Sequence, residues 1–184
     1  MPNQDSDRKL AELILYISAK CANDRKFGAT KLNKILYFSD FFAYGRFESA
    51  ISGAEYFKLP NGPAPRRLKP IKDALVKSGD LAIQQVPFWS GKVLLKTVNL
   101  RLPDLTLFTG REIALVDEVI EMLSSDDAKS VSEKTHDMAG WNAVEMEQTI
   151  PYATILVSHD PLSRAEIAFG QALAIQLSRD QSAA

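Results

Sequence analysis

The chain has 184 residues, of which 46% are hydrophobic and 24% charged, and its formal net charge is −1. This composition excludes disordered, collagen-like and coiled-coil chains, and it predicts one globular domain over residues 1–184 that buries its own core without disulfides or metals. The balanced charge argues against nucleic acid and anionic lipid as partners, because both bind to an excess of Lys and Arg.

The features of the chain that report on its compartment point to the cytoplasm. Cys21 is the only cysteine, which excludes an internal disulfide and a cysteine-based zinc site and fits a reducing compartment. The N-terminus is polar and acidic, unlike a secretory signal, and no segment approaches the roughly 20 consecutive apolar residues of a transmembrane helix. We therefore expect neither export nor membrane insertion.

The first predicted elements are two helices. Asp5 or Ser6 caps a helix whose apolar residues recur at positions i, i+3, i+4 and i+7. Residues 30–44 are apolar almost all round the helical cylinder, with Gly28 before them and Gly45 as a C-terminal stop. This second pattern predicts a buried central helix, whose tyrosines and phenylalanines belong to the core rather than to a ligand site.

A loop, a third helix and a hairpin follow. Residues 46–65 hold too many glycines and prolines for a helix, and they predict a loop with an extended piece near Tyr56. Helical spacing returns over residues 66–78, with a proline near the first turn. Residues 81–86 and 93–100 alternate loosely between apolar and polar and predict an antiparallel hairpin. Because two strands alone are marginally stable, this hairpin must lie on the helices.

Three more helices are predicted in the rest of the chain. Thr109 and Glu112 have the spacing of a capping box and precede an amphipathic helix. A shorter polar helix is expected over residues 126–138, an extended segment at Ile150 because it precedes a proline, and a final helix over residues 163–178. The sum is a mainly α, compact single-domain fold with a small antiparallel β-hairpin or sheet (α+β), an architecture that many functions share.

The chain offers few residues for a metal, cofactor or nucleophile site. His136 and His159 stand far apart in no metal-ligand motif, and Cys21 lies in no nucleophile signature. Gly62 is followed by Pro63, which lacks the backbone N–H that a phosphate-binding loop uses. We therefore expect no metal, no cofactor and no enzymatic activity.

Two polar features keep both a functional and a structural interpretation open. His136 beside Trp141 could serve in an acid–base site, although a histidine in such a turn more often hydrogen-bonds a neighbouring backbone group. The densest basic cluster could meet an acidic partner or phosphates, although a solvated helix face explains it more simply. This cluster comprises Arg66, Arg67, Lys69 and Lys72.

Three motifs of the chain, in order, resemble those of a known family. Residues 31–40, KLNKILYFSD, are similar to the KLNKLLYFAD helix of the Panacea, or SocA-like, antitoxin family, a family of phage-associated domains. Residues 51–56 and 59–65, ISGAEY and LPNGPAP, resemble that family's glycine–tyrosine and GPxP segment. His136 with Trp141 matches its late histidine–tryptophan motif.

The resemblance implies a compact helical domain with a small sheet that binds a cognate protein toxin. Such a domain neutralises the toxin directly or, in SocA-like members, presents it to a cellular protease, and no catalysis is implied. The motif-bearing core covers about residues 8–152, which leaves the predicted helix 163–178 outside it. The candidate motif or partner-binding positions are Lys31, Asn33, Asp40, Tyr56, Gly62, Pro63, His136 and Trp141 from the motifs and Arg66 from the basic cluster.

Two alternatives stand beside this interpretation: a small enzyme that uses His136 as its acid–base group, and a nucleic-acid-binding regulator that uses residues 66–72. Asp40, on an otherwise apolar helix, must be paired or exposed because a lone buried charge is costly, and we expect it to accept hydrogen bonds from the loop 51–65. We expect His136 and Trp141 to form a structural clasp in which each ring N–H donates to the backbone.

Overall fold

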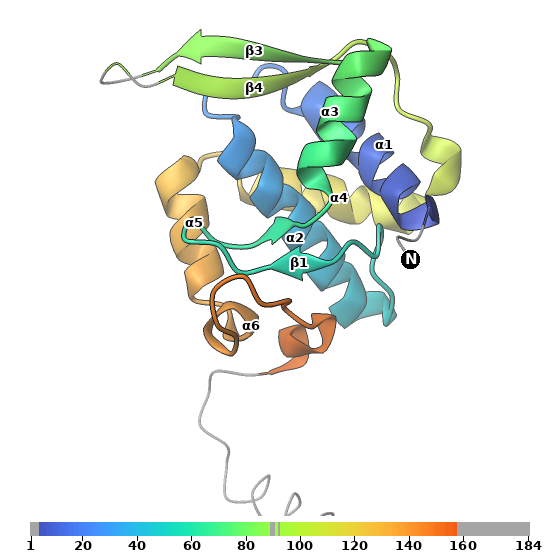
Figure 1. Ribbon diagram of the computed structural model, residues 1–184. Helices are drawn as coiled ribbons and strands as arrows, with labels where there is room; N and C mark the ends of the chain where they lie inside the picture. The colour runs from blue at the N-terminus through green and yellow to red at the C-terminus, as the bar shows by residue number, and fades with distance from the viewer. Residues whose placement is uncertain (1–3, 89–90, 92, 158–184) are drawn as a thin grey trace, which may run out of the picture.

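The computed structural model describes residues 4–88, 91 and 93–157. Within these residues, six α-helices and two antiparallel two-stranded sheets form one compact, mostly helical fold, which confirms the predicted fold class (Figure 1). The helices are α1 (Gln4–Lys20), α2 (Ala29–Phe47), α3 (Leu68–Ser78), α4 (Gly110–Met122), α5 (Ala128–His136) and α6 (Ala139–Asn142). The strands are β1 (Tyr56–Phe57), β2 (Ala64–Pro65), β3 (Leu81–Pro87) and β4 (Val93–Asn99), and the 3-10 helices are η2 (Leu105–Leu107) and η3 (Tyr152–Leu156).

Helix α2 runs through the middle of the fold and packs against α1, α4, α5 and β2 (Figure 1). Leu32 and Leu36, for example, are fully buried. This burial is expected, since a helix that is apolar on every side is stable only when other elements cover it. The predicted central helix is confirmed, but its predicted end at Gly45 is wrong. α2 continues to Phe47 and ends before Glu48, which has a left-handed φ of 59°. One glycine inside a helix costs only about 1 kcal/mol, and the Phe47 side chain packs against the core.

Helix α1 already includes the residues that were predicted to cap it. Within the described residues it starts at Gln4, so Asp5 and Ser6 lie inside the first turn and the predicted cap is wrong. Acidic side chains are favourable in a first turn, because the backbone N–H groups there have no partner in the helix. The predicted apolar face is confirmed as buried, and it comprises Leu10, Leu13, Ile14 and Ile17.

Strands β3 and β4 form the predicted hairpin and pair in antiparallel register along their whole length. The hairpin lies across one end of the helices, where β4 packs on α1 and β3 packs on α3 (Figure 1). A buried hydrogen bond of 2.6 Å joins the hydroxyl of Ser18 on α1 to that of Thr97 on β4. The helices thus supply the support that two strands lack by themselves.

Local signals set the boundaries of α3 and α4. Helix α3 has Pro70 in its first turn and ends at Gly79, whose φ of 80° lies in the left-handed region that favours glycine. Helix α4 opens with a capping box, in which the Thr109 hydroxyl accepts from the Glu112 N–H at 3.4 Å. The Glu112 carboxylate accepts in turn from the Thr109 N–H at 2.6 Å. Both helices confirm the predictions from sequence.

The last described segment returns to the centre of the fold. The N–H of Ile150 donates to the Tyr56 carbonyl of β1 at 2.9 Å, which confirms an extended backbone before the proline. The final helix predicted over residues 163–178 lies outside the described residues. Of the helices that the structure describes, none is long and apolar enough to cross a membrane.

Candidate partner-binding surface

Asp40 lies on α2 inside the core and has no exposed surface. Its carboxylate accepts hydrogen bonds from the Ser52 N–H at 2.7 Å, from the Ser52 hydroxyl, and from the Tyr56 hydroxyl at 2.8 Å. Burial raises the pKa of Asp40, and the three donors oppose that rise. The expectation that Asp40 accepts hydrogen bonds from the loop after α2 is therefore confirmed, and Tyr56 serves as one of its donors.

Lys31 is also buried and fastens two loops to the start of α2. Its ammonium donates to the Asp24 carboxylate at 2.7 Å and to the carbonyls of Ser124 and Asp126 at 3.0 Å each. A lysine has three N–H donors, so all of them are used. Lys31 joins the loop after α1 to the turn between α4 and α5, and it keeps no donor for a partner.

Lys34 lies one turn further along α2, beneath the glycine–proline turn. Its ammonium donates to the Pro63 carbonyl at 3.0 Å, and burial lowers the pKa of Lys34 to about 7. Gly62 has a φ of 88°, and a Cβ at Gly62 would lie 2.7 Å from Lys34 Nζ and collide with the Thr135 hydroxyl. Only glycine fits this turn, so Gly62 and Pro63 hold the loop against α2 and α5.

Asn33 is half-buried on α2. Its Oδ1 has no hydrogen-bond partner among the residues that the structure describes, and neither has the hydroxyl of Tyr37 one turn later. Both atoms are buried, so neither is offered at the surface in this conformation. Asn33 therefore differs from Lys31 and Asp40 on the same helix, because its buried amide oxygen has no hydrogen-bond partner in the described residues.

Arg66 precedes α3 and is bound on several sides. Its Nε donates to the Glu55 carboxylate at 2.7 Å. Its Nη2 donates to the Glu147 carbonyl at 2.7 Å and to the Thr149 hydroxyl at 3.3 Å. The guanidinium also lies 4.7 Å from the ring centre of Phe57. Arg66 therefore links β1 to the segment that follows α6.

Two of the three other cations of the basic cluster are paired with acids as well. Arg67 contacts the Asp7 carboxylate at 2.8 Å, and Lys69 contacts the Asp73 carboxylate at 2.7 Å. These acids neutralise the charge that phosphates would need. The geometry therefore favours the solvated helix face over a nucleic-acid interface at residues 66–72.

His136 and Trp141 stack, with ring centres 4.1 Å apart and ring planes 24° apart. The Trp141 Nε1 donates to the Leu59 carbonyl at 3.4 Å, and the Lys58 ammonium lies 4.1 Å from the indole centre. The predicted clasp is confirmed for Trp141. The predicted hydrogen bond of the His136 ring is wrong, because its Nε2 is buried without a partner in the described part of the chain. Stacking on the indole orients the imidazole instead.

The structure does not gather the motif positions into one site. Most of them hold separate junctions of the fold: Asp40 with Tyr56, Gly62 with Pro63, His136 with Trp141, and, singly, Lys31 and Arg66. Asn33 holds none through a hydrogen bond among the described residues. Sequence reasoning missed Lys34 as a member of this framework. Its signal was present, because a lysine on a helix that is apolar all round must be buried and paired.

Among the large apolar side chains that are exposed, one group lies on the hairpin and another in the segment that follows it. Ile83, Val93 and Leu95 are exposed on the hairpin. The segment after β4 exposes Leu102, at 84% of its surface, beside a shallow pocket of about 370 Å³ that Tyr16 also lines. Contiguous apolar side chains at a surface are typical of protein–protein contact sites.

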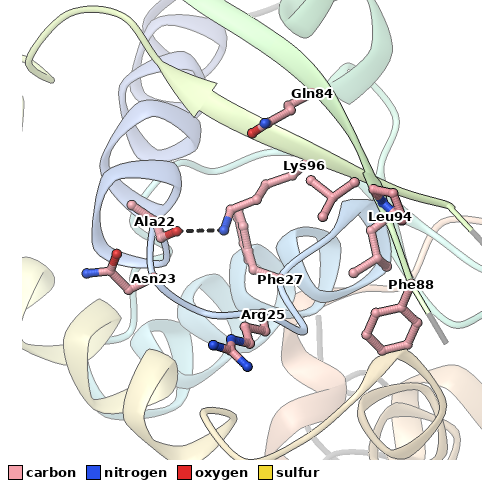
Figure 2. A pocket seen from close by; sticks show the side chains of 10 residues that line it. Ala22, Asn23, Arg25, Phe27, Gln84, Phe88, Leu94 and Lys96 are labelled. Atoms are coloured by element: carbon pink, nitrogen blue, oxygen red, sulfur yellow. Dashed lines mark hydrogen bonds between the residues drawn. The ribbon is translucent and has the colours of Figure 1, made fainter.

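A larger cleft of about 730 Å³ opens between the hairpin and the loop that joins α1 to α2 (Figure 2). Lys96 reaches from β4 toward this loop, and its ammonium donates to the Ala22 carbonyl at 2.6 Å. Arg25 lines the cleft from the loop, and Phe88 lines it from the end of the hairpin. Sequence reasoning missed Arg25 and Lys96, which stand far apart in the chain and belong to no motif.

The fold and its motif residues define a helical domain in which the polar side chains of one central helix fasten the surrounding loops. A family model described as "Antitoxin SocA-like, Panacea domain" matches residues 32–142, which run from α2 to the end of α6 and make up more than half of the chain. The chain therefore belongs to the SocA-like antitoxin family, as the three motifs implied. No curated protein and no solved structure matches it.

Proposed function

We propose that this chain is a cytoplasmic antitoxin that binds a cognate protein toxin and thereby neutralises it. The observation that carries the proposal is the family match over residues 32–142. The matched region contains α2 from Leu32 onward and most of the loops that the buried polar residues of α2 hold, so the shared motifs belong to one continuous framework. The buried free thiol of Cys21 fits a reducing compartment.

The roles of the motif residues support recognition through other side chains. Lys31, Asp40 and Arg66 are engaged within the fold, so they are not available to a partner without breaking those contacts. The exposed apolar side chains and the cleft beside the hairpin supply contact points of the kind that protein interfaces use. We expect a complex that buries roughly 1,200–2,000 Å² in total, the standard size for a specific interface.

Co-expression tests this function. Each reading frame next to the gene is expressed alone and together with this chain from separate inducible promoters, with an empty vector as control. We expect one neighbour to stop growth alone, to be harmless with this chain, and to co-purify with it in a stoichiometric complex. The proposal fails when every neighbour is harmless alone and the tagged chain recovers no stoichiometric partner.

Binding can neutralise the toxin by two routes, and the half-life of the toxin separates them. Direct inhibition leaves the toxin as long-lived with this chain as without it. Delivery to a cellular protease shortens its half-life, and deletion of that protease restores the toxin and its toxicity. A pulse–chase measurement in co-expressing cells reads both outcomes.

A further inference from the structure

The cleft between the hairpin and the loop before α2 has the size of a site for one or two side chains of a partner. Its volume of about 730 Å³ lies within the range of ligand pockets in proteins. One wall comes from residues 22–27 and the other from the paired strands β3 and β4 (Figure 2). Support from α1 and α3 holds the hairpin wall in place.

The charge of the cleft is positive. Of the described residues that line it, Arg25 and Lys96 are the charged ones, and both are cations. Lys96 donates to the carbonyls of Ala22 and Asp24 at 2.6 and 3.2 Å, which uses two of its three N–H donors and leaves the third for an acceptor in the cleft. One ammonium donor of Lys96 is therefore free, and the Arg25 side chain is a second cation in the lining of the same cleft.

Arg25 differs from the other arginines that the structure describes. It makes no hydrogen bond, ion pair or ring contact with the described residues, whereas each of the others has an acid or an aromatic ring as partner. The acid that precedes it, Asp24, does not neutralise it. The Asp24 carboxylate already accepts from the Lys31 ammonium and from the Lys26 N–H, both at 2.7 Å. All five N–H donors of Arg25 are thus available.

The remaining lining of the cleft is largely apolar. Phe27 lies at its base as a fully buried core residue, and Val86, Phe88 and Leu94 line the hairpin side. A nucleic acid backbone would need a row of cations, but this cleft combines two cations with apolar walls on a chain of net charge −1. Carboxylates are the anions that accompany apolar side chains in a polypeptide.

We propose that this cleft receives an acidic side chain of the toxin, with its carboxylate on Arg25 and Lys96 and an apolar neighbour of the same segment against Phe88 and Leu94. The inference rests on the proposed function and names the site through which it acts. The carboxylate gains charge-assisted hydrogen bonds, and a guanidinium can provide two of them in parallel. The apolar neighbour excludes water from that contact and strengthens it.

Charge reversal in the purified complex tests the site. Arg25→Glu should weaken toxin binding by about tenfold or more, with a smaller loss at high salt, because it sets a carboxylate against the incoming one. Lys77→Glu is the matched control, since Lys77 is an exposed cation on α3 with no polar contact in the described residues. It should bind within about twofold of the unchanged chain. Isothermal titration calorimetry at two salt concentrations measures both variants.

Cross-linking identifies the segment in the cleft. Cys21 is buried, and burial raises the pKa of its thiol to about 11, so a cysteine introduced by Gln84→Cys can be labelled selectively with a benzophenone maleimide. We expect the Gln84 position to cross-link to a toxin segment with an acidic residue next to an apolar one, and the control Lys77→Cys to give no such product. Reversal of that toxin acid to Lys should restore binding to Arg25→Glu.

The outcomes separate this inference from the proposed function. If no toxin partner exists, both are overturned. If the toxin is bound and neutralised but its affinity does not respond to Arg25→Glu, or if the cross-linked segment has no acid, the inference alone is overturned. A labelled DNA duplex is titrated in parallel, and DNA binding that Arg25→Glu abolishes while toxin affinity stays unchanged would assign the cleft to nucleic acid instead.

Discussion

Three charged side chains along α2 are buried and hydrogen-bonded, but the two in the described lining of the hairpin cleft have unused donors. Along α2, Lys31, Lys34 and Asp40 are buried, and each hydrogen-bonds to a loop that it holds in place. In the hairpin cleft, Arg25 is exposed without a polar contact in the described residues, and Lys96 keeps one donor unused. An unpaired charge is costly in the core and nearly free at the surface. The motif positions therefore stabilise the fold, and the cleft positions are available for recognition.

The largest effect is expected at Asp40. Asp40→Ala leaves the Ser52 N–H and the Tyr56 hydroxyl without an acceptor in the core. Each unsatisfied buried donor costs about 1–3 kcal/mol, so the free energy of unfolding should fall by about 3–5 kcal/mol. Asp40→Asn keeps one acceptor oxygen and should lower it less. Urea denaturation at neutral pH measures both variants. An Ala variant as stable as the unchanged protein would remove the contrast between α2 and the cleft.

The clasp after α5 is expected to come next. Trp141→Ala should lower the free energy of unfolding by about 3 kcal/mol, because the indole packs against the core. His136→Ala should lower it by only about 1 kcal/mol, the contribution of one aromatic stack. His136→Phe keeps the stack and should retain most of the stability. Thermal melts of the three variants measure these losses. Full stability of His136→Ala would contradict a structural role for the stack and favour the alternative of an acid–base site.

The glycine–proline turn gives a smaller, matched comparison. Gly62→Ala and Gly79→Ala both place a side chain at a left-handed φ, which costs about 1–2 kcal/mol. A Cβ at Gly79 meets nothing within 4 Å, whereas one at Gly62 lies 2.7 Å from Lys34 Nζ. Gly62→Ala should therefore be the more destabilising of the two in urea. Equal losses of stability in the two variants would contradict the steric conflict expected between a Cβ at Gly62 and Lys34.

Lys34 should make the stability depend on pH. Burial lowers its pKa to about 7 from its ordinary value of 10.5, so between these values the unfolded chain binds a proton that the folded chain has released. The stability contributed by Lys34 therefore rises as the pH increases from about 7 toward 10. The control Lys34→Met should lose this rise, and the difference between urea midpoints of the two proteins at pH 6.5, 8 and 9.5 measures it. A constant difference over this range would contradict the shift.

The smallest effect on stability is expected in the cleft. Arg25→Glu removes no contact with the described residues, so the free energy of unfolding should stay within about 0.5 kcal/mol of the unchanged protein. The same variant is the one expected to weaken toxin binding. A large loss of stability would show that Arg25 stabilises the fold, as the buried charges of α2 do, and would contradict its assignment to recognition.

Much of the fold could be predicted from the sequence because its signals are local. The capping box of Thr109 with Glu112, the left-handed stop at Gly79 and the all-round apolar pattern of α2 each act within a few residues. The three motifs likewise predicted the family that the comparison shows. The predicted end of α2 was wrong because the packing of Phe47 against the core outweighs the weak preference of Gly45 for a helix end. The predicted cap of α1 was wrong because Asp5 and Ser6 both lie inside the helix.

Short-range spacing and the order of the motifs along the chain were enough to predict most of the helices, the hairpin and the family. Which charged side chains are paired and which are free depends instead on contacts that form when the chain folds. Nothing near Arg66 in the sequence reveals that Glu147 and Thr149 meet it, and nothing near Arg25 reveals that it lines the hairpin cleft without an acid as partner in the described residues. The energy of a charge depends on its burial and on its partners, and both are set by segments that lie far apart in the chain.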